Sequence, residues 1–250
     1  MLFSPSVPTA YWVLTLALSI QGQPVQEPAT PWTDDRPFTR MAQNLGRDLV
    51  SMAGVDTAVI AAGGGLAAAA SRSSDDRLAR WAQEAGNQRS YTPIGSLLGN
   101  QWLQGGAAIA TYAIGKVQHS PEAAHIGSDL IRAQLLNGVF TTTLKIATTR
   151  QRPSGGKRSF PSGHASATFA SATVLGDHYG WKVGVPAYAF AGFIGWTRVR
   201  DREHWLSDVV FGSALGIVAG KAITRGHGRP AWTIAPVAMK GGGAIYFTKR

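Results

Sequence analysis

The 250-residue sequence predicts an all-α helical bundle with a small β-hairpin near its C-terminal end. Apolar residues recur at helical spacing from Phe38 onward, first at Met41, Leu45 and Leu49. The chain lacks the alternation of helix and strand patterns that a parallel sheet requires. Only residues 232–239 and 244–248, on either side of a glycine-rich turn, have the pattern of a hairpin.

The sequence predicts eight successive helices between residues 38 and 224. Their expected ranges are 38–49, 50–70, 78–85, 94–117, 121–149, 162–178, 181–197 and 204–224. The clearest helix start is Ser120, whose side chain can cap a first turn that holds Pro121 and Glu122. Pro153 disfavours a helical conformation for the residue before it, so this helix should end before Arg152.

Two of these predicted helices contain residues that disturb a helix. Gly63 to Gly65 predict either a helix break or a close contact with another helix. A phosphate-binding loop is not indicated there, because no Gly-Lys-Ser/Thr follows. Pro186 predicts that the helix over 181–197 either starts at that proline or is kinked by it. Residues 87–92 are expected to form a loop.

The chain divides into four predicted regions. Residues 11–20 form a short apolar core, so residues 1–22 are interpreted as a signal peptide, with an N-terminal anchor as the alternative. Residues 23–37 are rich in proline and predict a linker. Residues 38–228 form the helical domain, and residues 229–250 form the tail that holds the hairpin.

Composition and charge narrow the classes of function. The chain has no cysteine, which excludes disulfides, thiolate catalysis and cysteine-based zinc sites. Its net charge is +10, which attracts phosphate esters and anionic lipid headgroups. No nucleic-acid-binding signature is present, so no nucleic-acid partner is expected. The mean hydropathy of −0.03 is low for a bundle of spanning helices but does not decide between a soluble and a membrane protein. The expected helical stretches 94–117 and 209–222 are rich in Ala and Gly, with few large aliphatic residues, which favours a soluble or peripherally attached protein with association at a membrane surface.

Three motifs in the second half of the chain carry most of the chemistry. They are Lys145-x6-Arg152-Pro153, Pro161-Ser162-Gly163-His164 and Thr197-Arg198-x5-His204-x3-Asp208. Together they supply three permanent cations, a helix N-terminus, and two histidines, one of which has a carboxylate four residues later. This is the set of groups that a metal-free site for a phosphate dianion requires.

The second motif predicts a helix N-terminus that faces an anion. Ser162 can cap the helix, Gly163 lets a phosphate approach the backbone, and His164 lies in the first turn. The alternative is an ordinary cap with an incidental histidine. A nucleophilic serine elbow is excluded, because Phe160 and His164 stand where that motif needs glycine.

The third motif predicts an oriented imidazole. His204 and Asp208 are four residues apart and are expected on one face of a helix, where the carboxylate fixes the tautomer of the ring. The alternative is a surface ion pair. A metal held by His164, His204 and Asp208 is disfavoured by the cations nearby.

The spacing of the three motif cations predicts where each one lies relative to a helix. Lys145 and Arg152 are expected to project the same way from the end of one helix, and Arg198 is expected to precede a loop over 199–203. Each cation alone is more often a solvated surface residue, and only the joint occurrence of the three motifs overturns that interpretation.

These motifs resemble the signature of the type 2 phosphatidic acid phosphatase and vanadium haloperoxidase superfamily. Every spacing of the signature is met over residues 145–208, and the single change is Thr197 for the usual serine. The resemblance implies an α-helical bundle. It also implies a phosphatase that needs no cofactor and binds vanadate as a phosphate analogue.

The resemblance also implies a role for each residue of the motifs. It makes His204 the nucleophile that becomes a phosphohistidine, Asp208 the group that orients it, and His164 the general acid. The equatorial phosphate oxygens would be held by a set of cations and helix-end groups: Lys145, Arg152, Ser162, Gly163 and Arg198.

Several alternatives stay open at this level. The substrate is expected to be a phosphorylated small molecule or a lipid phosphate or diphosphate, and an exported protein would act in the periplasm or at the extracytoplasmic face of the membrane. A vanadate-dependent haloperoxidase and a non-catalytic phosphate or lipid binder are the competing functions. Arg150 and four basic neighbours are expected to be mostly solvated, and four histidines have no assigned role: His119, His125, His178 and His227.

Overall fold

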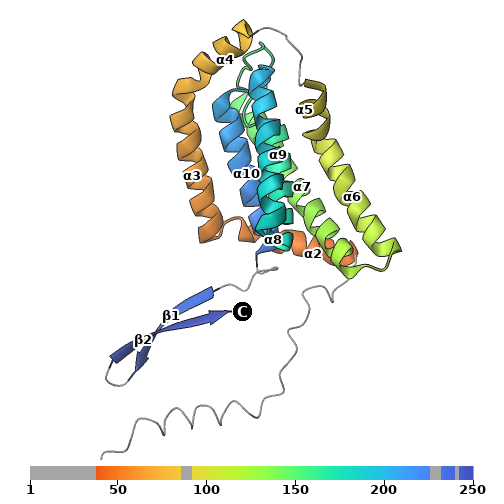
Figure 1. Cartoon of the computed structure of the whole chain (residues 1–250), viewed down its shortest axis with the longest axis vertical. Helices are drawn as coiled ribbons and strands as arrows, with labels where there is room; N and C mark the ends of the chain where they lie inside the picture. Colours follow the sequence, from red (N-terminus) through yellow and green to blue (C-terminus); the bar gives the residue numbers. More distant parts are fainter. Residues whose placement is uncertain (1–37, 86–91, 226–231, 240–241, 250) are drawn as a thin grey trace, which may run out of the picture. The chain divides into compact units, whose positions relative to one another are not determined.

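The structure, a computed structural model, describes residues 38–85, 92–225, 232–239 and 242–249 (Figure 1). The predicted signal peptide, the predicted linker and most of the predicted loop over 87–92 lie outside the described residues. The elements are α2 (Phe38–Ser51), α3 (Val55–Ser71), η1 (Arg72–Ser74), α4 (Asp75–Glu84), α5 (Thr92–Leu98), α6 (Gln101–Val117), α7 (Pro121–Thr148), α8 (Gly163–Tyr179), α9 (Trp181–Arg200) and α10 (Leu206–Thr224), followed by strands β1 and β2. The predicted helical bundle is thus confirmed for residues 38–85 and 92–224.

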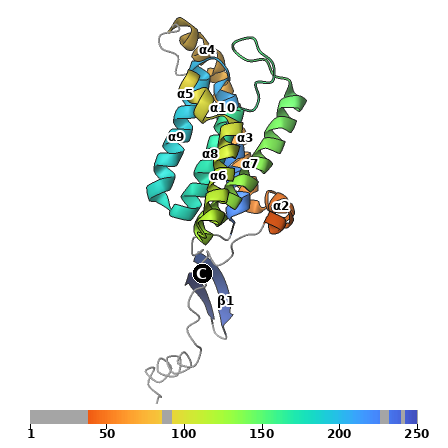
Figure 2. The same ribbon diagram turned by 90° about the vertical axis from the view of Figure 1, so that its right-hand side faces the viewer.

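Helices α8 and α10 form the centre of the bundle. Helix α10 packs against α3, α7 and α8, and α8 also contacts α7 and α9 (Figures 1 and 2). Glycines on α10 allow its close approach to α8: a Cβ added at Gly212 would lie 2.6 Å from the Ser162 carbonyl oxygen, and one at Gly216 would lie 2.2 Å from that of Ser166. Side chains are absent at these positions because the two backbones are almost in contact.

The start of α7 is the one expected from the sequence. The Ser120 hydroxyl accepts a hydrogen bond from the Ala123 amide at 3.3 Å, and Pro121 occupies the first turn. The helix ends at Thr148, and Thr149 has a left-handed conformation with φ of 45°. Lys145 therefore lies in the last turn, whereas Arg152 lies in the following loop. The prediction that both project from one helix is wrong, because the helix ends between them.

The structure shows what happens at the glycines and the proline that were expected to interrupt or bend a helix. Helix α3 runs through Gly63 to Gly65 without a break, and a Cβ added at Gly64 would lie 2.1 Å from the Cβ of Ala214. Gly64 therefore marks a close contact with α10, whereas a Cβ at Gly63 or Gly65 would meet nothing within 4 Å. Helix α9 begins at Trp181 and contains Pro186 within it.

The single helix expected over 94–117 is two helices. Helix α5 ends at Leu98, and α6 begins after Asn100, whose side chain accepts a hydrogen bond from the Trp102 amide at 2.7 Å. The break has a local cause, because an asparagine that caps a new helix ends the preceding one. Gly99, at the break, is buried against Ile194 and His164.

Large apolar side chains are exposed on the outer helices. They lie on α6 at Trp102, Leu103, Ile109, Ile114 and Val117, and on α9 at Trp181, Val183, Val185, Phe190, Phe193 and Trp196. Among the described residues, α10 is long and apolar enough to cross a membrane, although 61% of its apolar stretch is buried within the protein. The segments Gln43–Ser51 and Val55–Glu84 meet the same criterion only as a pair, with a bend of 59° between them.

The C-terminal strands form a two-stranded antiparallel sheet. Strand β1 (Trp232–Met239) pairs with β2 (Gly242–Lys249), with Trp232 opposite Lys249 and Met239 opposite Gly242. The first strand has the bounds expected from the sequence, and the second begins two residues earlier than expected and ends one residue later.

Candidate active site

The N-terminus of α8 forms one wall of the candidate site. Ser162 is the N-cap: its hydroxyl accepts a hydrogen bond from the Ala165 amide at 3.5 Å, and its own amide donates to the Asp208 carbonyl at 3.0 Å. A Cβ added at Gly163 would lie 3.7 Å from the Cε of Lys145. The free amides at the start of α8 and the Lys145 side chain therefore lie on the same side of the site.

His204 is held next to Asp208, but not in the way expected. The Nδ1 of His204 lies 3.7 Å from Oδ2 of Asp208, and both side chains are buried. The prediction that the two residues share a face of one helix is wrong, because α10 begins only at Leu206. Asp208 instead caps this helix by accepting the Trp205 amide at 3.0 Å. The imidazole is thereby carried by the loop before α10.

Ser159 lies between the imidazole and the carboxylate. Its hydroxyl donates a hydrogen bond to Oδ2 of Asp208 and lies 3.5 Å from Nδ1 of His204. Ser159 is fully buried. With Nδ1 directed toward Ser159 and Asp208, the other ring nitrogen, Nε2, is the one left for chemistry.

Arg150 belongs to the site, although it is only a variable position of the first motif. Its guanidinium donates to Oδ1 of Asp208 at 2.6 Å and to Oδ2 of Asp75 at 2.8 Å. Asp75, the first residue of α4, also accepts the amide and the hydroxyl of Ser207 at 2.9 and 2.6 Å. The expectation that Arg150 is solvated is wrong, because a buried Asp208 carboxylate needs a cationic partner.

Sequence reasoning missed Ser159, Arg150 and Asp75 for one reason. Each contacts Asp208 or its neighbour Ser207 from a distant part of the chain. The available signals were that Arg150 is a variable position within the first motif and that Ser159 lies between the first two motifs. The sequence around Asp75 contained no such signal.

The three predicted phosphate-binding cations already have protein partners. Arg152 pairs with the Glu203 carboxylate, while Arg198 donates to the Ser96 hydroxyl at 2.8 Å and to Asp201 at 3.0 Å. Lys145 donates to the Arg158 carbonyl at 2.9 Å. Among the described residues, the buried Nε of Arg152 has no hydrogen-bond partner. Each guanidinium has five N–H donors, so both arginines keep donors for an anion.

The two basic groups near the α8 terminus have lowered pKa values. Burial lowers the pKa of Lys145 to about 8, and the nearby charge of Arg152 adds to the shift. Burial also lowers the pKa of His164 to about 4, assisted by the charges of Arg198, His204 and Lys145. His164 therefore lies within electrostatic reach of Arg198, His204 and Lys145, and Lys145 lies within reach of Arg152.

The pKa values of His204 and Asp208 are also shifted. Burial lowers the pKa of His204 below its ordinary value, and the interaction with Asp208 only partly offsets this effect. Burial by itself would raise the pKa of Asp208. Interactions with His204 and Ser159 and the charge of Arg150 outweigh it and keep that pKa below the usual range. At neutral pH the pair therefore consists of a neutral imidazole and a carboxylate.

The structure thus gathers the residues of all three motifs into one site. Of the basic neighbours outside the motifs, Lys157 and Arg158 are exposed. Arg202 donates to the Pro153 carbonyl at 3.0 Å, and Arg200 donates to the Ala82 carbonyl at 3.2 Å and lies over the Trp81 ring. The latter two arginines therefore hold neighbouring segments in place.

Comparison with known proteins agrees with this geometry. Residues 127–232 match the PAP2 superfamily, and this range contains every residue of the three motifs. Over these residues the chain is similar to the PAP2 superfamily, and they include the cations, the helix N-terminus and the two histidines that converge in the site.

Three curated relatives share part of the chain. A lipid A 1-phosphatase of Porphyromonas gingivalis is 37% identical over 98 residues, which are 38% of this chain and 22% of that protein. A lipid A 4'-phosphatase of Helicobacter pylori is 28% identical over 105 residues, 40% of this chain and 53% of that protein. A PA-phosphatase related-family protein of Dictyostelium discoideum is 26% identical over 134 residues, 42% of this chain and 49% of that protein.

The aligned segments therefore span about a fifth of the first relative and about half of the other two. Among solved structures, the crystal structure of Aquifex aeolicus LpxE matches with a TM-score of 0.48 and 22% identity. The match covers 60% of this chain and 94% of that one.

Proposed function

We propose that this protein is a phosphatase that hydrolyses lipid phosphates through a phosphohistidine at His204. The observation that carries the proposal is the buried imidazole of His204, whose Nδ1 is directed at Asp208 and Ser159 and whose pKa is lowered by burial. A neutral imidazole with one nitrogen occupied has a lone pair on the other, which is the nucleophile that covalent phosphoryl transfer needs.

The first half of the reaction forms the intermediate. The Nε2 lone pair of His204 attacks phosphorus, and the bond from phosphorus to the ester oxygen breaks. His164 gives its proton to the leaving oxygen, so the alcohol departs neutral. The pKa of His164 is lowered to about 4 in the free protein, and the negative charge of a bound phosphate dianion raises it, which favours the protonated ring that acts as the acid.

The second half restores the enzyme. Water attacks phosphorus, and His164 accepts a proton from the water. The N–P bond breaks and inorganic phosphate leaves. Charge on the equatorial oxygens is stabilised in both halves by Lys145, Arg152 and Arg198 together with the first amides of α8, because these donors are fixed before the substrate arrives. The three cations supply the electrostatic stabilisation, so the proposed reaction needs no metal.

Lipid A-type glycolipid phosphates are the proposed substrate class. Two relatives are named lipid A phosphatases, one acting at the 1-position and one at the 4'-position. The exposed apolar side chains of α6 and α9 support membrane association, because large apolar patches rimmed by polar residues commonly mark contact with lipid or protein. We place the protein at the extracytoplasmic side of a membrane.

A substrate panel tests this proposal. The purified full chain is assayed with chelator on a lipid A-type phosphate, phosphatidate, a prenyl diphosphate and a soluble phosphomonoester. We expect the highest kcat/KM on the glycolipid phosphate and no loss with chelator. Equal rates on all four substrates would remove the lipid assignment, and unchanged activity in His204→Ala would overturn the mechanism.

A separate measurement tests the location. Membranes from expressing cells are extracted with alkaline carbonate, which releases soluble and loosely bound proteins. We expect at least part of the protein to stay with the membrane. Complete release would contradict membrane association through α6 and α9 without bearing on the chemistry at His204.

A further inference from the structure

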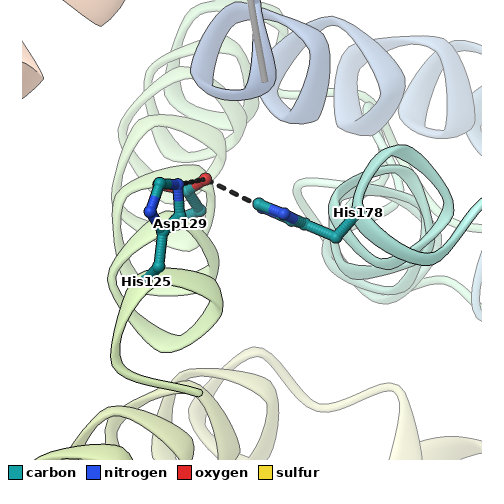
Figure 3. A group of neighbouring side chains, drawn as sticks. All are labelled: His125, Asp129 and His178. Carbon is teal, nitrogen blue, oxygen red and sulfur yellow. Dashed lines mark hydrogen bonds and ion pairs between the residues drawn. The ribbon is translucent and has the colours of Figure 1, made fainter. Parts of the chain in front are cut away.

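A second cluster of titratable side chains lies far from the candidate active site. His125 and Asp129 project from the first third of α7, and His178 projects from the last turn of α8 toward them (Figure 3). Along α7, Asp129 precedes Lys145 by 16 residues, a separation of about 24 Å. The cluster therefore belongs to the other end of α7 and α8 and is not part of the phosphate site.

Both imidazoles present the same nitrogen to the same carboxylate oxygen. The Nε2 of His178 lies 2.9 Å from Oδ2 of Asp129, and the Nε2 of His125 lies 3.5 Å from that atom. All three atoms lie within 4.8 Å of one another. The two rings meet edge to face, with centroids 5.4 Å apart.

These separations suit a single metal ion. With bonds of about 2.0–2.1 Å to nitrogen and oxygen, tetrahedral ligands stand about 3.3 Å apart. The two measured separations lie on either side of that value. A simple ion pair would need only one histidine at Oδ2, whereas here two rings from different helices converge on it.

The surroundings fix the three groups in place. His125 and Asp129 are 2% and 0% exposed, and the His178 side chain is fully buried. Arg132 donates to the other oxygen of Asp129, Oδ1, and also to the carboxylate of Asp48 on α2. Arg132 therefore orients the carboxylate through Oδ1 while Oδ2 faces the two histidines, as hydrogen-bonding groups around metal ligands do. Its charge is offset by the two carboxylates that it contacts.

We propose that His125, Asp129 and His178 bind a divalent transition-metal ion, with Zn²⁺ as the expected metal. Two imidazole nitrogens and one carboxylate oxygen form a ligand set that Zn²⁺ accepts, and the fourth position is left for water. Each ring would bind the ion as a neutral imidazole through the Nε2 lone pair, with its one proton on Nδ1. The ion would tie α7 to α8 and stabilise the bundle, with no part in phosphoryl transfer.

Metal binding to the untagged full chain tests this site directly. After chelator treatment and dialysis, we expect the wild-type protein to bind one Zn²⁺ per chain in calorimetry and its Tm to rise on Zn²⁺ addition. Co²⁺ is the spectroscopic probe, and we expect the intense visible bands of tetrahedral coordination. His125→Gln and His178→Gln should each weaken Zn²⁺ binding by more than about 100-fold, because each removes a direct ligand.

The matched control is His119→Gln, which makes the same substitution at an exposed histidine of the α6–α7 connection. It should keep one Zn²⁺ per chain and the wild-type Co²⁺ spectrum. If either cluster variant fails to fold, the wild-type Co²⁺ spectrum decides by itself. Co²⁺ bands of six-coordinate hydrated type, or full Zn²⁺ affinity in both cluster variants, would overturn the site.

The test is independent of the proposed enzymatic function. His164→Ala and His204→Ala should bind Zn²⁺ with wild-type stoichiometry, because the metal would not use the phosphate site. Loss of Zn²⁺ binding in these active-site variants would assign the metal to the phosphate site and reject the cluster. When Zn²⁺ is removed and activity is assayed at a temperature at which the metal-free protein stays folded, kcat/KM should stay within about twofold of its starting value, because the chemistry takes place at the distant His204.

Discussion

Arg150 donates a hydrogen bond over 2.6 Å to Oδ1 of Asp208, although it is only a variable position of the first sequence motif. The same guanidinium contacts Asp75, which in turn accepts hydrogen bonds from Ser207, the residue before Asp208. Helix α4 and the loop after α7 therefore fix the carboxylate that faces His204. A fully buried carboxylate needs such partners to stay ionised.

The first prediction concerns this arginine as a positioning residue. Arg150→Gln removes the cation that helps to keep the pKa of Asp208 low, so that pKa should rise. The carboxylate is then protonated at higher pH, and the acid limb of the kcat/KM profile should move upward in pH. Near neutral pH we expect a loss of about 100-fold from misplacement of His204. The pH profile of purified variants measures both effects.

Two variants separate the role of Arg150 from a general loss of charge. Arg150→Lys keeps a cation near Asp208 and should recover part of the activity and the wild-type acid limb. Lys157→Gln removes an equal charge from an exposed neighbour and should leave the profile unchanged. An unshifted acid limb in Arg150→Gln would show that Asp208 does not depend on this contact.

The second prediction is an alkaline limb set by Lys145. Because its pKa is lowered to about 8, this side chain loses its charge as the pH rises through that value. Substrate binding to the free enzyme should then weaken, so kcat/KM should fall above about pH 8 while kcat changes less. Lys145→Arg introduces a group that keeps its charge and should move the limb to higher pH. An alkaline limb that stays in place in this variant would assign it to another group.

The third prediction concerns the leaving group. If His164 protonates the departing oxygen, His164→Ala should lower kcat/KM by about 10²–10⁴-fold on an alkyl phosphate. The loss should be much smaller on p-nitrophenyl phosphate, because its leaving group departs without a proton. Parallel assays of both substrates measure the difference. Equal losses would mean that His164 binds the phosphate without acting as an acid.

The fourth prediction concerns the close contact between α8 and α10. The Cβ of Gly216→Ala would lie 2.2 Å from a backbone oxygen of α8, so the helices must move apart. We expect a loss of about 1–3 kcal/mol in the free energy of unfolding. Gly106→Ala is the matched control, since a Cβ there meets nothing within 4 Å and alanine favours a helix. Thermal unfolding should show a lower Tm for the first variant only.

Local signals in the sequence were sufficient for much of the fold. The cap at Ser120 and the end of α7 before Pro153 were predicted from residues within one or two turns of each helix end. The cap of α8 is also local, because the Ser162 hydroxyl accepts a hydrogen bond from the amide of Ala165, three residues later. Such interactions depend on neighbouring residues, so a sequence contains the information needed to predict them.

The sequence by itself determined the motif spacings, the positive charge and the pairing of His204 with Asp208. Only the tertiary structure decided that His204 precedes α10, that Arg150 and Asp75 brace Asp208, and that His178 meets His125 and Asp129. The partners in these contacts are as many as 132 residues apart, as for Asp75 and Ser207. Packing of α4, α7, α8 and α10 creates them, and helix periodicity contains no information about which helices pack together.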